Sequence, residues 1–300
     1  MQLLDYLPLL TRVDAWECPD YAALTALQLR RPDCKVFYNI TIDGIKDLIF
    51  EQTYNPAIDR TRSSYFYRGM PDASYNLVTS LARNCKGSYA ELEYPLLENF
   101  INYVRIEDPS INESIWKAMV IGQHYGLPTR LLDWTHSTLV ALHFANTEDN
   151  LDKLSQRDCV VWRIDLRDLN RNLPQKYRDY LESKDTFVFS LDGLAEMAEN
   201  IQQYDADMGD HALVCFEPPS VDQRIVNQYS FFSAIPSGIT DLEAFLEANT
   251  EHTVKYVIDK RLRWELRDIL DQFNINERMI HPGTDGIAKW LARHYYVKSK

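Results

Sequence analysis

The chain of 300 residues lacks a long apolar run, an excess of basic residues and any closely spaced pair of cysteines. No segment approaches about 18 apolar residues without a charge, so we expect no membrane-spanning helix. The net charge of −12 argues against broad binding to nucleic acid or anionic membrane, because contact with phosphates needs a basic surface. The N-terminal segment has no basic region followed by a cleavage site of small residues, so no signal peptide is expected.

The cysteines are few and widely spaced. They are Cys18, Cys34, Cys85, Cys159 and Cys215. An odd number without a CxxC pair indicates reduced thiols and argues against a disulfide framework or a zinc site. Together with the absence of a signal peptide, this pattern predicts a cytoplasmic protein.

Several common enzyme motifs are also missing. The sequence has no GxGxxG or GxxxxGK[ST] loop, which argues against the usual dehydrogenases and ATPases, and no GxSxG elbow of a hydrolase. No repeat or low-complexity linker divides the chain. We therefore expect one globular unit over residues 1–300, with a motif-bearing part at 38–145, a strand-rich part at 146–245 and a C-terminal strand and helices at 246–300.

Hydrophobic periodicity predicts helices and strands that alternate without a strict βαβ rhythm. Helices are predicted from Ile42 onward and over residues 89–104, 113–126, 137–145, 264–273 and 285–297. Strands are predicted over residues 63–70, 129–134, 158–166, 211–219, 224–236 and 254–260. This order predicts an α+β fold, with small mixed or antiparallel sheets and flanking helices.

The segment Gly122–Ala145 concentrates polar and ring-bearing side chains directly before an apolar helix. In TRLLDWT, the period of a strand puts Arg130, Leu132 and Trp134 on one face and the remaining residues on the other. Neither face is purely apolar, so we expect one face to line a pocket. Asp133 is expected to be buried and paired, and Asp133→Asn to cost roughly 2–4 kcal/mol if one charge loses its partner.

Other roles for these residues stay open at this stage. Arg130 and Asp133 can pair with each other, or with Arg83, simply to hold a bend in the chain. His124 suits a general acid or base near neutral pH, but it suits a helix end equally well. His136 and His143 lack a third candidate ligand nearby in the sequence, so no metal site is predicted.

Three segments together resemble the FRG domain family. They are FYRG (66–69), QHYGLPTRLLDWT (123–135) and ALHFA (141–145), and the later segments RIVNQYSFF and ILDQFNINERMIHPGTDGIAKWL are similar to that family as well. The resemblance covers residues from about Tyr38 to Leu291, and the long central motif is specific. It implies a bacterial or phage protein of the kind often associated with phage defence.

A more distant likeness links the same segments to ADP-ribosyltransferases of the Arg-Ser-Glu type. In that family a first strand carries an arginine, a second carries Ser or Thr before a helix, and a third carries Glu or Gln. The corresponding positions here are Arg68, Thr135 (or Ser137) and Gln228, in matching chain order. The resemblance therefore implies an ADP-ribosyltransferase-like core. The usual glutamate is replaced by Gln228, which favours NAD binding, or transfer to acceptors other than protein, over protein-directed transfer.

This likeness implies NAD as the substrate and assigns a role to each matching residue. Cleavage of the nicotinamide bond passes through an oxocarbenium-like state, as in glycoside hydrolysis. An arginine holds a pyrophosphate through its two-pronged guanidinium, a glycine lets the backbone approach, and aromatic rings stack on nicotinamide. The implied catalytic residues are Arg68, Thr135, Gln228 and His124, and the implied NAD-binding residues are Arg68, Gly69, Tyr67, Arg83, Arg130 and Tyr125.

The leading hypothesis is an ADP-ribosyltransferase-like or NAD-cleaving enzyme that acts in phage–host conflict or as a toxin-like effector, with a protein as one candidate acceptor or partner. The alternative is a catalytically inactive FRG module that binds a nucleotide or a partner protein. Under the first hypothesis, we expect six residues to converge on one concave site: Arg68, Arg83, His124, Arg130, Asp133 and Gln228.

Overall fold

The structure of the protein, a computed structural model, describes residues 12–15, 35–51, 53–55, 59–219 and 223–298. It has the predicted α+β character, and its backbone contacts define two compact units. Unit 1 comprises Met1–Tyr75, Ser137–Ile164 and Thr253–Lys300, and unit 2 comprises Asn76–His136 and Asp165–His252. Each unit is therefore assembled from segments that lie far apart in the sequence.

Unit 1 is built around a mixed sheet. Its strands, in spatial order, are β1 (Arg12–Ala15), β2 (Lys35–Ile40), β11 (Val254–Ile258), β7 (Cys159–Asp165) and β5 (Tyr65–Met70). Strand β2 pairs in parallel with β1 and β11, whereas β11 and β7 are antiparallel. Strands β3 (Thr53–Asn55) and β4 (Arg60–Arg62) form a separate antiparallel pair.

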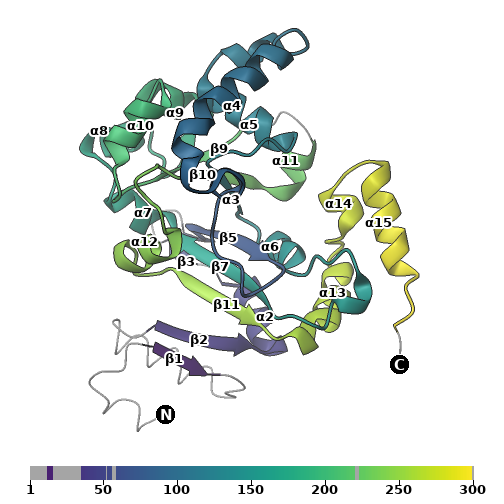
Figure 1. Cartoon of the computed structure of the whole chain (residues 1–300). Helices are drawn as coiled ribbons and strands as arrows, with labels where there is room; N and C mark the ends of the chain where they lie inside the picture. The colour runs from purple at the N-terminus through teal and green to yellow at the C-terminus, as the bar shows by residue number, and fades with distance from the viewer. Residues whose placement is uncertain (1–11, 16–34, 52, 56–58, 220–222, 299–300) are drawn as a thin grey trace, which may run out of the picture. The chain divides into compact units, whose positions relative to one another are not determined.

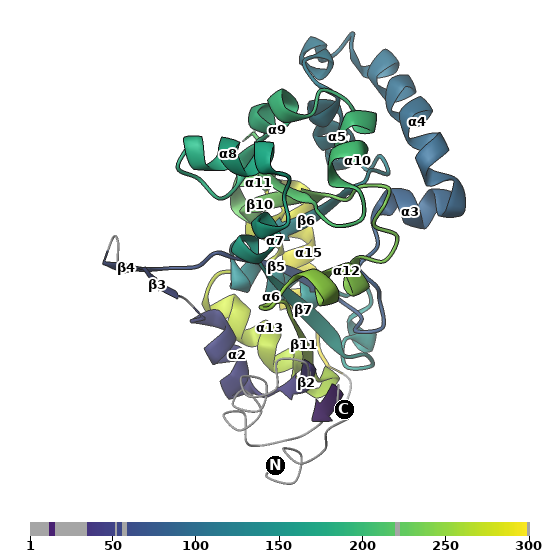
Figure 2. The same cartoon turned by 90° about the vertical axis from the view of Figure 1, so that its left-hand side faces the viewer.

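The helices of unit 1 follow the predicted local signals. They are α2 (Ile42–Ile49), α6 (Thr138–Ala145), α13 (Arg263–Gln272), α14 (Glu277–Ile280) and α15 (Thr284–His294), with 3₁₀ turns at Leu151–Lys153 and Lys260–Leu262. Helix α2 is capped by Thr41, whose side chain accepts from the amide of Gly44, and α6 is capped by Ser137. Helices α2 and α13 lie side by side and share a core with α6 and β7 (Figures 1 and 2).

Gly69 allows β5 and α6 to pack backbone against backbone. A Cβ atom at this position would lie 1.8 Å from the carbonyl oxygen of Ala141 and 2.4 Å from the amide nitrogen of Ala145. These are main-chain atoms of a helix, which cannot rotate away as a side chain can. Glycine is therefore required here by the interior of unit 1, independently of any ligand.

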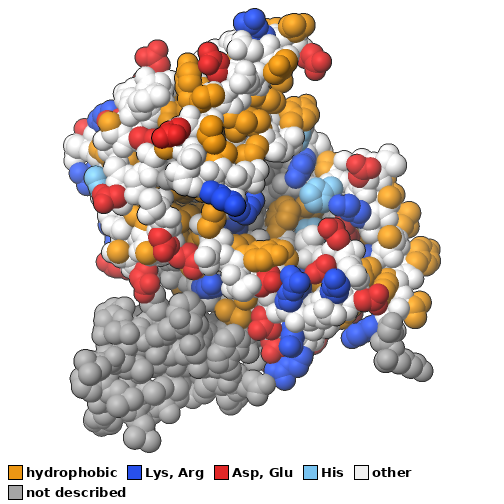
Figure 3. All heavy atoms as spheres, viewed as in Figure 1, with side chains coloured by type: hydrophobic (Ala, Val, Ile, Leu, Met, Phe, Trp, Pro, Cys, Tyr) orange, Lys and Arg blue, Asp and Glu red, His pale blue; other side chains and the backbone are white. Residues whose placement is uncertain are grey.

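Helix α15 confirms the helix predicted over residues 285–297, and it carries apolar residues that lie on the surface. Ile287, Leu291 and Tyr295, four residues apart, all belong to the exposed hydrophobic residues. Hydrophobic side chains are visible along this edge of unit 1, at the right of Figure 3. No helix in the described part of the chain is long and apolar enough to cross a membrane.

Unit 2 combines a smaller sheet with a large helical layer. Its strands are ordered β6 (Leu131–Thr135), β10 (Ser230–Ala234), β9 (Val214–Glu217) and β8 (Phe189–Ser190), with β10 antiparallel to both neighbours and β8 parallel to β9. The helices are α3 (Ser80–Cys85), α4 (Tyr89–Val104), α5 (Ile115–His124), α7 (Leu166–Arg171), α8 (Gln175–Ser183), α9 (Leu191–Met197), α10 (Ile201–Met208), α11 (Gln223–Gln228) and α12 (Leu242–Asn249), with 3₁₀ turns at Lys86–Ser88 and Pro109–Asn112.

Buried aromatic residues tie the helices of unit 2 to its sheet. The indole of Trp116 donates to the carbonyl oxygen of Ala198 at 2.7 Å, and its ring meets Tyr204 edge to face. The hydroxyl of Tyr204 donates to the carbonyl oxygen of Ala234 and accepts from the amide of Val214. Helices α8, α9 and α10 lie together in both views (Figures 1 and 2).

The strand predicted over residues 224–236 is wrong in its first half. Residues Gln223–Gln228 form helix α11, and strand β10 begins only at Ser230. Tyr229, with a φ of 48°, turns the chain between the two elements. The helices α7–α10 and α12, which the sequence analysis did not predict, also lie among the strands of this part of the chain.

Cys85, Cys159 and Cys215 are free thiols, as the cysteine spacing predicts. Cys18 and Cys34 lie outside the described residues. Burial raises the pKa of Cys159 to about 12. A thiol with so high a pKa is protonated at neutral pH and does not act as a nucleophile.

The buried His143 of α6 should make the stability of the folded protein depend on pH. Its ring is buried, and its Nδ1 accepts from the guanidinium of Arg267 at 3.0 Å. Burial, followed by the charge of Arg267, lowers the pKa of His143 from 6.5 to about 3. Between these values the unfolded chain binds a proton that the folded protein does not, so this group makes stability fall as the pH falls.

We expect His143→Gln to flatten the stability profile between about pH 6.5 and pH 5, where this histidine contributes up to about 1.4 kcal/mol per pH unit. Glutamine does not titrate, and its oxygen can accept from Arg267. The measurement is the free energy of unfolding from urea denaturation at several pH values. An unchanged slope in the variant would show that His143 is not held neutral in the folded protein.

Candidate functional site

The polar part of the segment Gly122–Ala145, residues 123–135, lies in unit 2 and comprises the end of α5, the following loop and β6. Helix α5 ends at His124, and Gly126 adopts a φ of 88° while the amide of Leu127 donates back to the carbonyl oxygen of Gly122. A positive φ of this size favours glycine and ends a helix. The predicted exit at Gly126 is therefore confirmed.

The side chain of Gln123 holds this loop to the start of β6. Its amide nitrogen donates to Asp133 at 2.8 Å, and its amide oxygen accepts from the hydroxyl of Thr129. The same hydroxyl oxygen accepts from the amide of Leu131. Gln123 therefore links the end of α5 to Thr129, just before β6, and to Asp133, in the middle of β6.

Asp133 corrects one sequence prediction. The sequence predicts a buried Asp133 side chain, but this side chain is exposed, and it accepts from Gln123. Water solvates an exposed carboxylate, so replacing Asp133 by asparagine leaves no buried charge without a partner. The loss of 2–4 kcal/mol expected for Asp133→Asn no longer follows.

Arg130 is the buried charge of this segment. Its Nε and Nη2 donate to the two carboxylate oxygens of Glu93, and its Nη1 and Nη2 donate to Asp205. Burial would lower the pKa of Arg130, but the hydrogen bonds and charges of Glu93 and Asp205 outweigh burial and raise it. The guanidinium is thus already held by two carboxylates.

This arrangement gives Arg130 a structural role, and the cofactor contact that the resemblance implies stays a prediction. The cavity that Arg130 helps to line measures about 50 Å³ and has mainly apolar walls, including Leu77, Ile239 and Leu242. Small-molecule pockets usually measure about 300–1,000 Å³, so this cavity does not accommodate a dinucleotide.

Thr135 and Gln228, two residues with implied catalytic roles, lie together in unit 2. The hydroxyl of Thr135 donates to the backbone carbonyl of Gln228 at 2.7 Å, across 93 positions of sequence. Pairing of β6 with β10, which sets Thr135 opposite Ser230, produces this contact. Thr135 is buried, Gln228 is partly exposed, and the adjacent Tyr229 is 59% exposed.

The other predicted residues of unit 2 lie near the surface. Arg83 is exposed on α3, and its guanidinium donates to the carbonyl oxygen of Val78 at 3.4 Å. His124 is partly buried at the end of α5 and meets the ring of Tyr125 edge to face. Tyr125 itself is 76% exposed, so its ring is accessible for stacking.

Arg68, Gly69 and Tyr67 all belong to β5 of unit 1. Arg68 is partly buried, whereas Tyr67 is 1% exposed and packs in the core against α6 and α13. Burial raises the pKa of the Tyr67 hydroxyl. A ring this deeply buried is not accessible for the nicotinamide stacking that the resemblance implies.

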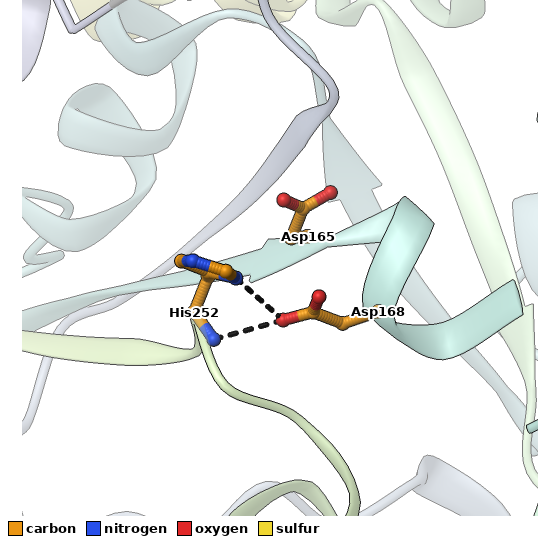
Figure 4. Close-up of side chains that lie close together, drawn as sticks. All are labelled: Asp165, Asp168 and His252. Atoms are coloured by element: carbon orange, nitrogen blue, oxygen red, sulfur yellow. Dashed lines mark hydrogen bonds and ion pairs between the residues drawn. The ribbon is translucent and has the colours of Figure 1, made fainter. Parts of the chain in front are cut away.

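A second polar cluster in unit 2 was missed by the sequence analysis. Asp165, at the end of β7, Asp168, in the first turn of α7, and His252, which follows α12, have ligand atoms within 4.8 Å of one another (Figure 4). Their types are those that bind divalent metals. The separation of 84 residues between Asp168 and His252 gave no recognisable motif.

The fold and the site define an α+β protein with a polar strand-to-helix segment. Residues 63–153 match the FRG domain, and this range includes FYRG, QHYGLPTRLLDWT and ALHFA. The match supports the predicted FRG family for this part of the chain. No curated protein and no solved structure matches the chain.

Proposed function

We propose that the protein binds NAD and breaks its nicotinamide–ribose bond, as an ADP-ribosyltransferase-like or NAD-cleaving enzyme. The observation that supports this function best is the 2.7 Å hydrogen bond from the hydroxyl of Thr135 to the backbone of Gln228. Two residues to which the ADP-ribosyltransferase likeness gives catalytic roles are thereby adjacent, although the chain separates them widely. A role in phage–host conflict belongs to the same proposal.

The reaction needs little beyond orientation and charge stabilisation. The bond between C1′ of the ribose and the nicotinamide nitrogen breaks, and nicotinamide leaves with the electron pair. Water or an acceptor hydroxyl then adds to C1′ and loses its proton. In this scheme the amide of Gln228 hydrogen-bonds a ribose hydroxyl, Thr135 fixes the backbone that carries it, and the exposed ring of Tyr229 stacks on a base.

We expect NAD to raise the melting temperature of the protein, and Gln228→Ala to weaken NAD binding by about tenfold, or about 1.4 kcal/mol. The neighbouring Asn227→Ala is the matched control, because it removes an amide from the same helix, one whose oxygen accepts from the side chain of Gln223. Melting curves with increasing NAD measure binding, and released nicotinamide measures cleavage.

The same assay is applied to Arg68→Ala. We expect this variant to lose the increase in melting temperature with NAD, because the resemblance assigns the pyrophosphate to Arg68.

The possible results separate the hypotheses. A melting shift with no nicotinamide release would favour the inactive nucleotide-binding module over the enzyme. A protein that neither shifts with NAD nor releases nicotinamide would contradict the proposal. If Arg68→Ala is strongly destabilised without NAD, Arg68 has a structural role and its binding result carries no weight.

A further inference from the structure

The cluster of Asp165, Asp168 and His252 brings two buried carboxylates close to one imidazole. Asp165 is 7% exposed and Asp168 is 2% exposed, and ligand atoms of all three residues lie within 4.8 Å of one another. Figure 4 shows that the three side chains come from the end of β7, the start of α7 and the segment that follows α12, and that His252 and Asp168 contact each other directly. Two negative charges this close together inside a protein repel each other and favour a nearby cation.

Asp168 carries the strongest sign of a ligand. Its Oδ2 accepts from the amides of Glu251 and His252 and lies 2.9 Å from Nδ1 of His252. Its Oδ1 is buried and accepts no hydrogen bond from any residue that the structure describes. The guanidinium of Arg171 lies 3.2 Å from Oδ1, but the Arg171 side chain is 60% exposed. A largely solvated guanidinium compensates a buried carboxylate only weakly.

We propose that Asp165, Asp168 and His252 bind a divalent transition-metal ion, a site that the sequence analysis did not predict. One imidazole nitrogen and two carboxylate oxygens form a mixed donor set that suits Zn²⁺, Co²⁺ or Mn²⁺ better than Mg²⁺ or Ca²⁺, which prefer oxygen alone. The 2.9 Å between His252 and Asp168 is also a normal separation for two ligands of one ion. The remaining coordination positions are filled by water.

Metal binding replaces the direct contact between His252 and Asp168 by contacts of both side chains with the ion. The ion binds Nδ1 of His252, which requires the neutral ring with its proton on Nε2, and any proton displaced from Nδ1 passes to solvent. The ion then lies between both carboxylates and relieves their repulsion. It also fastens the segment at His252 to the start of α7, which the two backbone hydrogen bonds of Asp168 already hold together.

Two ligands can be changed without removing these backbone hydrogen bonds. Asp165 caps α7, with its Oδ1 accepting from the amide of Arg167, and asparagine serves equally well as a cap. Asp165→Asn therefore removes a charge while keeping the helix start. His252→Gln removes the imidazole but leaves the amide of His252, which donates to Asp168. The matched control is His211→Gln, because His211 lies 3.1 Å from Asp210 in an exposed pair of the same unit.

The experiment uses the full chain after dialysis against a chelator, titrated with Zn²⁺ in a calorimeter and with Co²⁺ in a visible spectrometer. We expect one ion per chain and visible Co²⁺ absorption bands. The dissociation constant should rise at least about tenfold in Asp165→Asn and in His252→Gln, and should be unchanged in His211→Gln. Mg²⁺ should compete only weakly.

Absence of saturable binding by the correctly folded protein would overturn the site. So would binding that Asp165→Asn and His252→Gln leave unchanged, because the ion would then lie elsewhere and the three residues would serve only as a structural clip. Circular dichroism of each variant verifies the fold. The readout is metal binding, so the result does not depend on whether the protein uses NAD.

Discussion

Gly69→Ala should destabilise unit 1 by about 3 kcal/mol or more, beyond the usual range for an overpacked interior. The added Cβ would lie 1.8 Å from the carbonyl oxygen of Ala141, so β5 and α6 cannot keep their present separation. Moving α6 away also opens the core formed by Tyr67, Leu142 and Leu266. The measurement is the free energy of unfolding from denaturant titration.

Gly87→Ala provides the control for Gly69→Ala. A Cβ at Gly87 has no atom within 4 Å, so this variant should be nearly as stable as the parent. Should Gly69→Ala prove as stable as the control, α6 can shift at little cost. Gly69 would then be required for another reason, such as the backbone approach to a dinucleotide that the resemblance implies.

Arg130→Met should cost about 3–5 kcal/mol of stability, because it leaves buried carboxylates without their cation. The side chains of Arg130 and Glu93 are 4% and 5% exposed, and that of Asp205 is 20% exposed. Methionine keeps the length of the side chain but offers no donor. Chemical denaturation measures the loss, with the exposed Arg83→Met as the control, which should change stability by less than about 0.5 kcal/mol.

A second variant tests whether the loss comes from the unpaired charges. Adding Glu93→Leu to Arg130→Met removes one orphaned carboxylate and fills its place with apolar atoms, so part of the stability should return. No recovery would mean that packing around Arg130 matters more than its charge. If Arg130→Met instead stays stable but loses the response to NAD, Arg130 contacts the ligand as the resemblance implies.

The sequence by itself determined those features that depend on neighbouring residues. The start of α2 at Ile42 and the end of α5 before Gly126 were predicted from local patterns and are confirmed. A capping hydroxyl or a positive φ acts over three or four residues, which a short stretch of sequence contains in full. The resemblance to the FRG domain belongs to the same category, because each of its three segments is a short continuous stretch of sequence.

Only the tertiary structure decided which distant residues meet. It assigned Arg130 to Glu93 and Asp205, which lie 37 and 75 positions away, and left Asp133 exposed. It also placed Gln228 at the end of a helix, where the aromatic residues that follow had favoured a strand. Pairing and burial depend on how whole elements pack, and a carboxylate has the same local sequence whether water or a guanidinium faces it.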